Sequence, residues 1–274
     1  MTGTAAVLMS VYGQEQPDYL DKCLDSVVNQ THLPQKIVLV KDGPLSESLD
    51  AVIDRYAGRH DLFKIVSLAE NRGLVHALNT GLQYCDCEYT FRMDSDDLSL
   101  PNRFERQLEF MEKHPEIGVL SSAMYEFDQD PDQPQYVKAV AADHEAIAKQ
   151  FPWRNPINHA ACCYRTALIR DAGGYPDLLY LEDYYLWSRL LCKGIRFHNL
   201  TEPLYLCRFN RATLTRRAGW INFRNECSLR WFLYRSNKSN SAVLLASVLL
   251  QVILRFAPIS IRNLLWNTIR RRVP

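Results

Sequence analysis

An acidic stretch at residues 91–97, FRMDSDD, holds Asp94, Asp96 and Asp97 within four positions. Three carboxylates this close repel one another and resist burial unless a cation lies among them. Hard oxygen ligands at positions i and i+2 suit Mg²⁺ or Mn²⁺, which take one or two carboxylates and complete their shell with water and phosphate oxygens. The stretch therefore predicts a site for a metal–diphosphate. The alternative is an acidic turn in which Asp94 or Asp97 caps a helix that begins near Pro101.

The positive charge of the chain is concentrated towards its C-terminal end. The chain has 274 residues, 47% of them hydrophobic, which is enough for one large α/β domain with an appended tail. The formal net charge is +1, yet no Asp or Glu follows Glu226, while eight Lys and Arg residues do. Residues 1–226 therefore carry about −7, which disfavours a nucleic-acid groove in the main body, and the tail predicts an anionic partner surface.

The eight cysteines contain no CxxC pair and no zinc-like spacing with histidine. Cys162 and Cys163 are adjacent, and a disulfide between neighbours is strained. The N-terminus has no basic region followed by a long apolar run, so we expect no signal peptide. We expect reduced, mostly buried thiols in a cytoplasmic protein.

Apolar runs and helical patterns alternate along the first hundred residues. They predict strands at 5–10, 36–40, 63–67 and 89–93, a loop at 11–16, and helices from 17, at 49–56 and at 71–82. This alternation predicts a doubly wound, largely parallel sheet flanked by helices. In such sheets ligands bind beyond the carboxyl ends of the strands, so residues 10–12, Asp42 and residues 94–97 should converge on one crevice. No GxGxxG or GxxxxGK[ST] loop follows the first strand, which disfavours dinucleotide and P-loop sites.

The same patterns continue downstream. They predict helices at 104–113, 144–150, 166–172 and 181–192, and strands at 118–127 and 161–164. We predict one domain over residues 1–235, with a nucleotide-binding half at about 1–100 and an acceptor-binding half at about 101–235.

The tail, residues 236–274, begins with a linker-like stretch, SNKSNS. Residues 242–254 are strongly apolar but too few to span a bilayer, which needs about 20 residues. Ser247, Gln251 and Arg255 form a narrow polar stripe, and residues 259–273 combine an apolar face, a basic rim and Trp266. We predict amphipathic helices lying on an anionic membrane surface. The alternative is a helix pair packed on the protein's own core or on a second subunit.

Five motifs in order carry a family resemblance. They are VLMSVYG at 7–13, KIVLVKDGP at 36–44, NRGLVHALNTGL at 71–82, FRMDSDDLSLPNRF at 91–104 and LEDYYLW at 181–187. Together they resemble the family 2 glycosyltransferases with the GT-A fold, over roughly residues 5–215. NPINH at 155–159, GGY at 173–175 and the basic tail look most like the bacterial enzymes that extend O-antigen or capsular repeat units, among them galactosyltransferases.

The resemblance implies a nucleotide-sugar donor bound at the first three strands. It places Ser10, Val11 and Tyr12 against the nucleoside, and Asp42 in hydrogen-bond contact with the base. The family more often has Asp-Asp-Gly-Ser where this chain has Lys-Asp-Gly-Pro at 41–44. Two further residues stand where the family contacts the nucleotide or its phosphates, although an exposed helix start is the alternative for both: Arg72 and His76.

The resemblance also divides the acidic residues between metal and base. Asp96 becomes the direct ligand of Mn²⁺ or Mg²⁺, and Asp94 lies near the ribose and the metal. Asp97 is left as a supporting contact or a helix cap. Asp183 becomes the general base, because transfer with inversion needs a carboxylate that accepts the proton of the acceptor hydroxyl and needs no covalent nucleophile. Glu182 projects about 100° away, so it favours the helix N-terminus or contacts the acceptor.

Three weaker candidates are basic. Arg208 follows an expected strand and would contact the diphosphate from a loop that folds over the donor, as would Arg216 or Arg217. His159 in NPINH would orient the acceptor or satisfy a buried backbone group. Ordinary surface charge is the alternative for each arginine.

The sequence thus predicts an inverting, metal-dependent glycosyltransferase that moves a hexose from a nucleotide sugar to a lipid-linked saccharide. UDP is the nucleotide that we expect in the donor. The enzyme would work at the cytoplasmic membrane face, in O-antigen or capsule synthesis. One alternative is a non-catalytic nucleotide-sugar sensor. The other is a DxD phosphatase, which would carry its aspartates directly after the first strand rather than the fourth.

Overall fold

The computed structural model describes residues 3–178, 180–209, 220–256 and 271–272. The first half alternates strands and helices: β1 (Ala5–Tyr12), α1 (Pro17–Val28), β2 (Lys36–Asp42), α2 (Glu47–Ala57), β3 (Phe63–Ser67), α3 (Leu74–Leu82) and β4 (Tyr89–Asp94). After the short strand β5 (Leu98–Ser99) come α4 (Arg103–Lys113), β6 (Ile117–Phe127), β7 (Tyr136–Lys138) and α5 (His144–Gln150). The remainder comprises a 3₁₀ turn η1 (His159–Ala161), β8 (Cys163–Arg165), α6 (Thr166–Asp171), α7 (Glu182–Cys192), β9 (Arg196–Arg208), α9 (Trp220–Arg235), α10 (Ser241–Phe256) and β10 (Arg271–Arg272).

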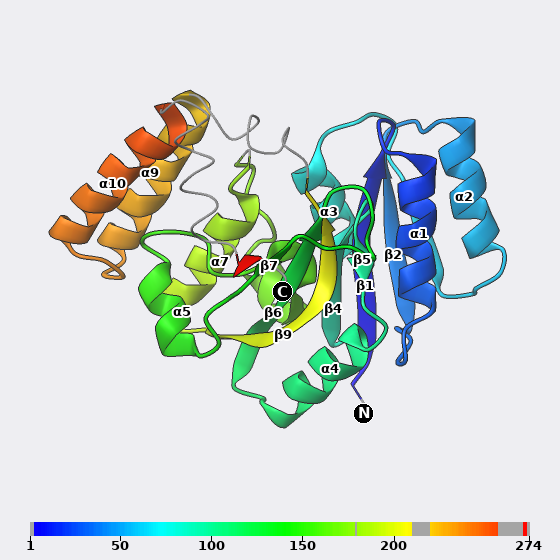
Figure 1. Cartoon of the computed structure of the whole chain (residues 1–274), viewed down its shortest axis with the longest axis horizontal. Coiled ribbons are helices and arrows are strands. Elements are labelled where there is room, and N and C mark those ends of the chain that lie inside the picture. The colour runs from blue at the N-terminus through cyan, green and yellow to red at the C-terminus, as the bar shows by residue number, and fades with distance from the viewer. Residues whose placement is uncertain (1–2, 179, 210–219, 257–270, 273–274) are drawn as a thin grey trace.

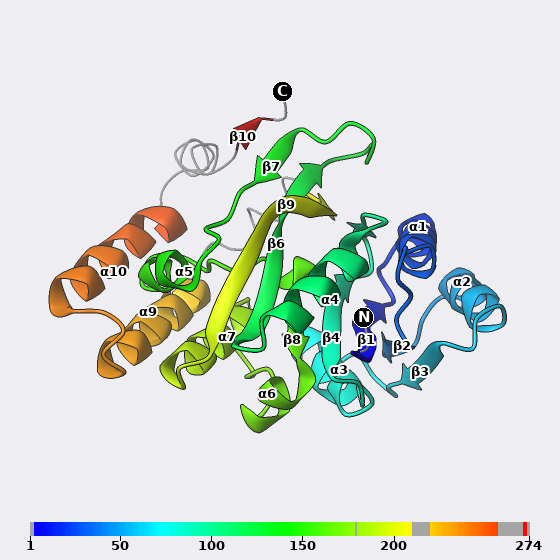
Figure 2. The ribbon, with the colours of Figure 1, turned by 90° about the horizontal axis from the view of Figure 1, so that it is seen from below.

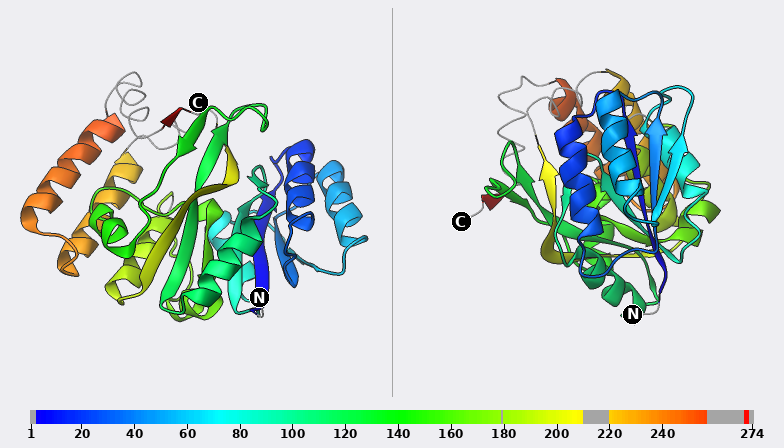
Figure 3. Two further views of the ribbon diagram at one scale, coloured as in Figure 1. Left: turned by 60° about the horizontal axis from the view of Figure 1, so that its bottom comes forward. Right: turned by 90° about the vertical axis from the view of Figure 1, so that its right-hand side faces the viewer.

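One curved sheet runs through the molecule (Figures 1 and 2). β1 lies between β2 and β4, β3 lies outside β2, and these four strands are parallel. β8 joins β4 in the antiparallel sense, β6 pairs antiparallel with β8 and parallel with β9, and β7 and β10 extend the far edge (Figure 3). The predicted doubly wound, mostly parallel sheet is therefore confirmed.

The sheet is buried on both faces, because successive side chains of a strand point to opposite sides. In β1, Ala6 and Leu8 join a cluster with α3 and α7, whereas Val7 and Met9 join a second cluster with α1, α2 and α4. Apolar side chains at every position of a strand thus bury it between helices. All eight cysteines, each within the described residues, are free thiols, as expected.

The structure corrects the predicted element ends in two places near the site. Val11 and Tyr12 were expected in a loop but continue β1, because β2 pairs with them through Lys41 and Asp42. The helix after the acidic stretch begins at Arg103 with Asn102 at its N-cap and no side-chain cap, so neither Asp94 nor Asp97 caps it.

The tail differs most from its prediction. The helix expected over 259–273 is wrong at Arg271 and Arg272, which form β10 against Val137 and Tyr136 of β7; residues 257–270 lie outside the described residues. α10 confirms a helix over 242–254, and α9 precedes it. Figure 1 shows these two helices side by side at the end of the molecule opposite α1 and α2. Within the described part of the chain, no helix is both long and apolar enough to cross a membrane.

Candidate functional site

The carboxyl ends of β1, β2 and β4 meet at one edge of the sheet. The strand register places Ser10 opposite Asp94 and Tyr12 opposite Asp42. The convergence predicted from the strand ends is therefore confirmed. The phenol of Tyr12 is exposed and Ser10 is half-buried, whereas the side chain of Val11 is buried in the core, which leaves only its backbone for contact with a ligand.

Asp42 organises the turn that follows β3. Its two carboxylate oxygens accept hydrogen bonds from the backbone N–H groups of Arg72 (2.9 Å) and Gly73 (3.0 Å). Gly73 has φ of +87°, which an L side chain rarely adopts. Asp42 thus fixes the entry to α3, and its side chain is nearly buried. Arg72 is exposed and His76 is half-buried on the same segment.

Asp94 is held from within the protein by Arg92. The Arg92 guanidinium is 1% exposed and donates to the carboxylate of Asp94 and to the carbonyl of Met93, while its Nε has no hydrogen-bond partner among the described residues. The side chain of Asp94 is 38% exposed, so it lies at the boundary between the buried arginine and the crevice. Residues i and i+2 of a strand share a face, which is the sequence signal that could have assigned this role to Arg92.

Asp96 lies among other carboxylates. Burial, together with the negative charges of Asp94 and Glu15, raises the pKa of Asp96 to about 7. Glu15, which sequence reasoning did not single out, accepts a hydrogen bond of 2.6 Å from the hydroxyl of Ser95. A cation bound beside Asp96 would stabilise the charged form of this carboxylate and so lower its pKa.

Asp97 does not cap a helix, and its carboxylate contacts β9 instead. Its carboxylate accepts the backbone N–H of Arg208 at 2.6 Å and a hydrogen bond from the hydroxyl of Tyr205. The guanidinium of Arg208 donates to the backbone carbonyl of Asp96 at 3.2 Å and lies 3.6 Å from the ring centre of Tyr19. Arg208 was predicted in a covering loop but is the last residue of β9, where it contacts the acidic stretch; its contact with a diphosphate stays a prediction.

A second buried arginine braces the same region and was not anticipated. Arg103 is 0% exposed and donates from Nη2 to the carbonyls of Arg92, Ala160 and Cys162 at 2.8–3.2 Å. Its guanidinium also faces the ring of Tyr205 at 4.9 Å. It therefore ties β4 to η1, and no periodic pattern reveals a buried arginine of this kind.

Glu182 and Asp183 are the first two residues of α7. The carboxylate of Asp183 accepts the side-chain amide of Asn155 at 2.7 Å and the backbone N–H of Tyr184 at 2.7 Å. Burial and the charge of Asp183 raise the pKa of Glu182 to about 7, and the charges of Arg92 and Asp94 also act on it. The start of α7 and the end of β4 are thus electrostatically coupled. Asn155 belongs to the NPINH stretch but had been given no role.

His159 contacts a side chain rather than a buried backbone group. Its Nε2 lies 3.1 Å from the hydroxyl of Tyr175. Burial and the nearby charge of Arg92 lower its pKa well below the usual value, so the imidazole is neutral. Asn79 of α3 clamps Tyr175 through bonds of 2.8 Å to its backbone N–H and carbonyl. Arg216 and Arg217 lie outside the described residues.

The donor set at the end of β4 fits a divalent metal that shares its shell with a ligand. Within the described residues, no three carboxylate, imidazole or thiol side chains are grouped to hold an ion alone. Asp94 and Asp96 offer two hard oxygen donors, and the side chain of Asp94 is partly exposed. One or two carboxylates completed by phosphate oxygens is the usual arrangement for Mg²⁺.

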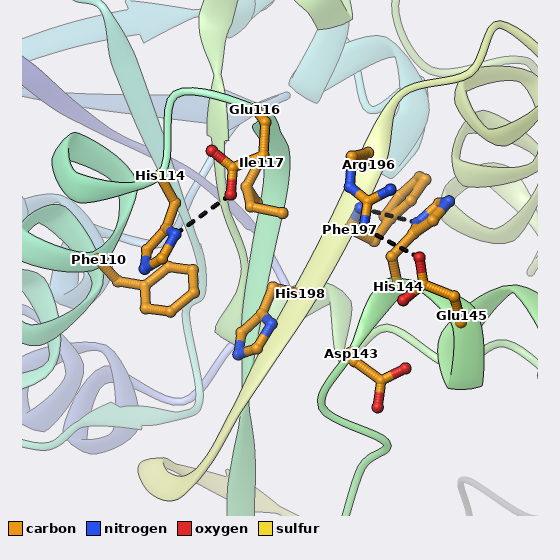
Figure 4. A pocket seen from close by; sticks show the side chains of 10 residues that line it. All are labelled: Phe110, His114, Glu116, Ile117, Asp143, His144, Glu145, Arg196, Phe197 and His198. Atoms are coloured by element: carbon orange, nitrogen blue, oxygen red, sulfur yellow. Dashed lines mark hydrogen bonds and ion pairs between the residues drawn. The ribbon is translucent and has the colours of Figure 1, made fainter.

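A separate pocket lies at the amino ends of β6 and β9 (Figure 4). Three histidines border it, His114, His144 and His198, and Phe110 stacks between His114 and His198. β6 runs in the same direction as β4, because both pair antiparallel with β8. The amino end of β6 is therefore at the edge of the sheet opposite the acidic stretch, and this pocket is not part of the candidate site.

Two bacterial glycosyltransferases illustrate the similarity in sequence. The amylovoran biosynthesis glycosyltransferase AmsE of Erwinia amylovora is 39% identical over 82% of this chain and 83% of its own length. The UDP-Gal:alpha-D-GlcNAc-diphosphoundecaprenol beta-1,3-galactosyltransferase of Escherichia coli is 32% identical over 97% of this chain and 96% of its own length.

Solved structures share the fold at lower identity. S. aureus TarS in complex with UDP-GlcNAc superposes with a TM-score of 0.68 at 18% identity, over 91% of this chain and 72% of that one. The mannosyltransferase PcManGT from Pyrobaculum calidifontis, in complex with GDP-Man and Mn²⁺, gives a TM-score of 0.63 at 17% identity, over 94% and 71%. The model of glycosyl transferase family 2 matches residues 6–172, more than half of the sequence, and the chain belongs to that family.

Proposed function

We propose that the chain is an inverting, metal-dependent glycosyltransferase that moves a hexose from a UDP-sugar to a lipid-linked saccharide in cell-surface polysaccharide synthesis. One observation carries this proposal. The turn η1 adjoins both β4 and α7, because the backbone N–H of Arg92 donates to the carbonyl of Cys162 at 2.9 Å and the ring of His159 lies 6.1 Å from that of Trp187, so the metal–diphosphate site and the candidate base lie on neighbouring elements. The names of the two relatives support a polysaccharide pathway, a UDP-galactose donor and a diphosphoundecaprenol-linked acceptor.

The donor would occupy the carboxyl ends of the parallel strands. The exposed ring of Tyr12 offers an apolar face to a base, and Asp42 lies opposite it in the register. The carboxylate of Asp42 already accepts two backbone bonds, and each oxygen retains a lone pair for the N–H of a uracil. Ser10 at the end of β1 lies opposite Asp94 of β4 in the strand register. The nucleotide-binding half of the proposed domain thus ends at the acidic stretch.

Asp96 and Asp94 would hold Mn²⁺ or Mg²⁺ at this point. When bound, the ion supplies positive charge that neutralises the diphosphate as it leaves. The chain's own contribution is to keep both carboxylates in place. Arg92 restrains Asp94, while Arg208 restrains the backbone of Asp96. A preorganised site of this kind needs no rearrangement at the moment of reaction.

Asp183 would act as the general base. The acceptor oxygen forms a bond to the anomeric carbon, the bond from that carbon to the diphosphate oxygen breaks, and the hydroxyl proton passes to Asp183. Asn155 and the N–H of Tyr184 fix the orientation of the carboxylate that accepts this proton. His159, which is neutral, and Glu182 would contact the acceptor from either side of this position.

The acceptor places the enzyme at a membrane. A saccharide joined to a lipid through diphosphate remains at the bilayer surface, so an enzyme that extends it works at that surface. We propose peripheral association with the cytoplasmic face through the tail that begins at residue 236, which carries cations and no carboxylate side chain.

A donor screen tests the proposal. Purified protein is incubated with UDP-hexoses, GDP-mannose and other nucleotide sugars, with Mn²⁺ or with EDTA, and release of nucleoside diphosphate is measured with and without a diphospholipid-linked saccharide. The proposal expects one UDP-sugar to be turned over, Mn²⁺ to be required, and the acceptor to accelerate release. Tight UDP-sugar binding with no turnover for any acceptor would favour a nucleotide-sugar sensor instead.

A further inference from the structure

Helix α10 has its polar side inward and its apolar side outward. Ser247 and Gln251 are 1% and 2% exposed. Five large apolar side chains are 42–64% exposed: Leu245, Leu249, Val252, Ile253 and Phe256. At about 100° per residue, these five fall within an arc of about 100° on one side of the helix. A helix that packs onto a protein in water has the opposite arrangement.

Helix α9 exposes a second stripe of mixed character. Trp220, Arg224, Trp231 and Arg235 follow one another at intervals of four, seven and four residues, and all four are exposed. The opposite side of α9 is buried, with Leu229 and Leu233 in the core cluster that includes α7. Tryptophan and arginine on one helix face are typical of a helix at a membrane interface.

The two stripes form one continuous surface. The ring of Trp220 lies 6.4 Å from that of Phe256, and Phe223 lies 5.5 Å from both. The beginning of α9 therefore adjoins the end of α10, and the two helices run in opposite directions at one end of the molecule (Figure 1). We call the exposed side chains of these two helices the hairpin surface. A contiguous patch of exposed apolar side chains marks an interaction site.

The charge around the hairpin surface is of one sign. Arg224, Arg235 and Lys238 are exposed, and the one acid between residues 220 and 256 is Glu226, whose carboxylate is buried against Arg230. A second copy of this chain docked on the same surface would bring like charges together. An anionic lipid headgroup layer over an apolar interior complements both the cations and the apolar side chains.

We propose that the hairpin surface lies on an anionic lipid bilayer, with the apolar face of α10 in the acyl–headgroup boundary. α9 is a rigid support for this contact, because Nη2 of Arg230 donates to the carbonyl of Trp153 at 3.1 Å and the ring of Phe232 lies 5.0 Å from that of Tyr185 on α7. α7 begins at Glu182 and Asp183, so the bilayer contact and the candidate base sit on directly packed helices. The link to a lipid-linked acceptor and the peripheral association through the tail rest on the proposed function, whereas the bilayer contact of α9 and α10 depends on their exposed side chains and would hold for any acceptor.

Vesicle co-sedimentation of the full chain tests the proposal. Vesicles of phosphatidylcholine, with or without phosphatidylglycerol, are mixed with wild type, with a Leu249→Glu/Ile253→Glu variant, and with Leu33→Glu as the control. Leu33 is equally exposed, at 46%, but lies between α1 and β2. Wild type and control should bind phosphatidylglycerol vesicles, and the double variant should bind at least about tenfold more weakly because it carries charge into the boundary.

The cations give a second, graded arm. Replacement of Arg224 or Arg235 by Gln should weaken partitioning about fivefold each, with a smaller effect at high salt. Equal binding by wild type and the double variant, or no binding by wild type, would overturn the proposal. Light scattering without lipid should give the same oligomeric state for both proteins. If wild type were a dimer and the double variant a monomer, the hairpin surface would instead be an interface with a second copy.

An activity readout separates this inference from the proposed function. With a water-soluble acceptor that lacks the lipid, the double variant should transfer as fast as wild type; with the acceptor embedded in vesicles it should transfer at least about tenfold more slowly, in line with its weaker binding. A wild type that binds vesicles but transfers to neither acceptor would refute the proposed function and leave the bilayer contact standing. If wild type and the double variant transferred to the embedded acceptor at equal rates, the hairpin surface would have no role in access to the acceptor.

Discussion

The end of β4 and the start of α7 each present two carboxylates, but the two pairs are supported by different chemistry. In each pair one carboxylate is restrained: Asp94 by the buried guanidinium of Arg92, and Asp183 by the neutral amide of Asn155. In each pair the other carboxylate has its pKa raised to about 7 by burial and by neighbouring charge, namely Asp96 and Glu182. The same two-residue arrangement therefore appears after β4 and at the start of α7.

The difference lies in how the restrained carboxylate is held. A guanidinium keeps its charge at every physiological pH, so Arg92 restrains Asp94 through an ion pair, which suits a carboxylate that takes part in binding a cation. An amide donor orients Asp183 without neutralising it, which suits a carboxylate that receives a proton. The β4 pair is accordingly assigned to metal and diphosphate, and the α7 pair to the acceptor.

The largest expected effect is on metal-dependent UDP binding, which should need the carboxylates after β4 and not those of α7. Asp96→Asn keeps the shape of the side chain and removes its charge. We expect Mn²⁺-dependent UDP affinity to fall about tenfold or more and transfer to fall about 10²–10³-fold, since a metal supplies several kcal/mol at a leaving group. Calorimetric titration of UDP with and without Mn²⁺ checks this. Glu182→Gln is the matched control, and an equal loss of affinity there would break the assignment.

The hydrogen bond from Asn155 should matter less and should act on rate rather than on donor binding. Asn155→Ala is expected to lower kcat about 10- to 100-fold, the value of one hydrogen bond to a charged group, with the donor KM unchanged. The acidic limb of the kcat–pH profile should also move to higher pH, because the anionic carboxylate loses a donor. A profile that keeps its shape while the rate falls would mark Asn155 as a structural residue only.

The smallest effect concerns stability. Because the pKa of Glu182 is raised from 4.5 to about 7, the folded state binds more protons than the unfolded state between these values, and the free energy of unfolding falls as pH rises through that interval. Glu182→Gln removes this penalty. The variant should be more stable than wild type by on the order of 1 kcal/mol at pH 8 and equally stable at pH 4. Urea unfolding at both pH values measures it; a constant difference would contradict the raised pKa.

Much of the donor side is predictable from sequence because its elements obey simple periods. β3 and α5 have the predicted bounds, and the strand ends placed Ser10, Asp42 and Asp94 at one edge before any coordinates. Parallel strands buried on both faces read as continuous apolar runs, and that pattern is local. Five ordered motifs then identified the family.

What could not be predicted depends on contacts between distant segments. α9 has apolar and aromatic residues around its whole circumference, and Asn222, Asn225 and Glu226 are buried. No apolar stripe with helical periodicity therefore predicts this helix from the sequence. The roles of Arg103 and Arg208 arise from carbonyl groups supplied by η1 and by the acidic stretch. The inward polar stripe of α10 was visible as a stripe, but its direction is set by packing against α9.

The assignment of the two pairs is tested most directly by Asp183→Asn, assayed in parallel for UDP-sugar binding with Mn²⁺ and for transfer to the acceptor. The amide keeps an oxygen for the N–H of Tyr184 and removes the proton-accepting charge. We predict donor affinity within about twofold of wild type and a loss of transfer of at least about 10²-fold, the usual contribution of a general base. Normal turnover by this variant, or loss of donor binding together with transfer, would contradict the division of the site into a metal pair and an acceptor pair.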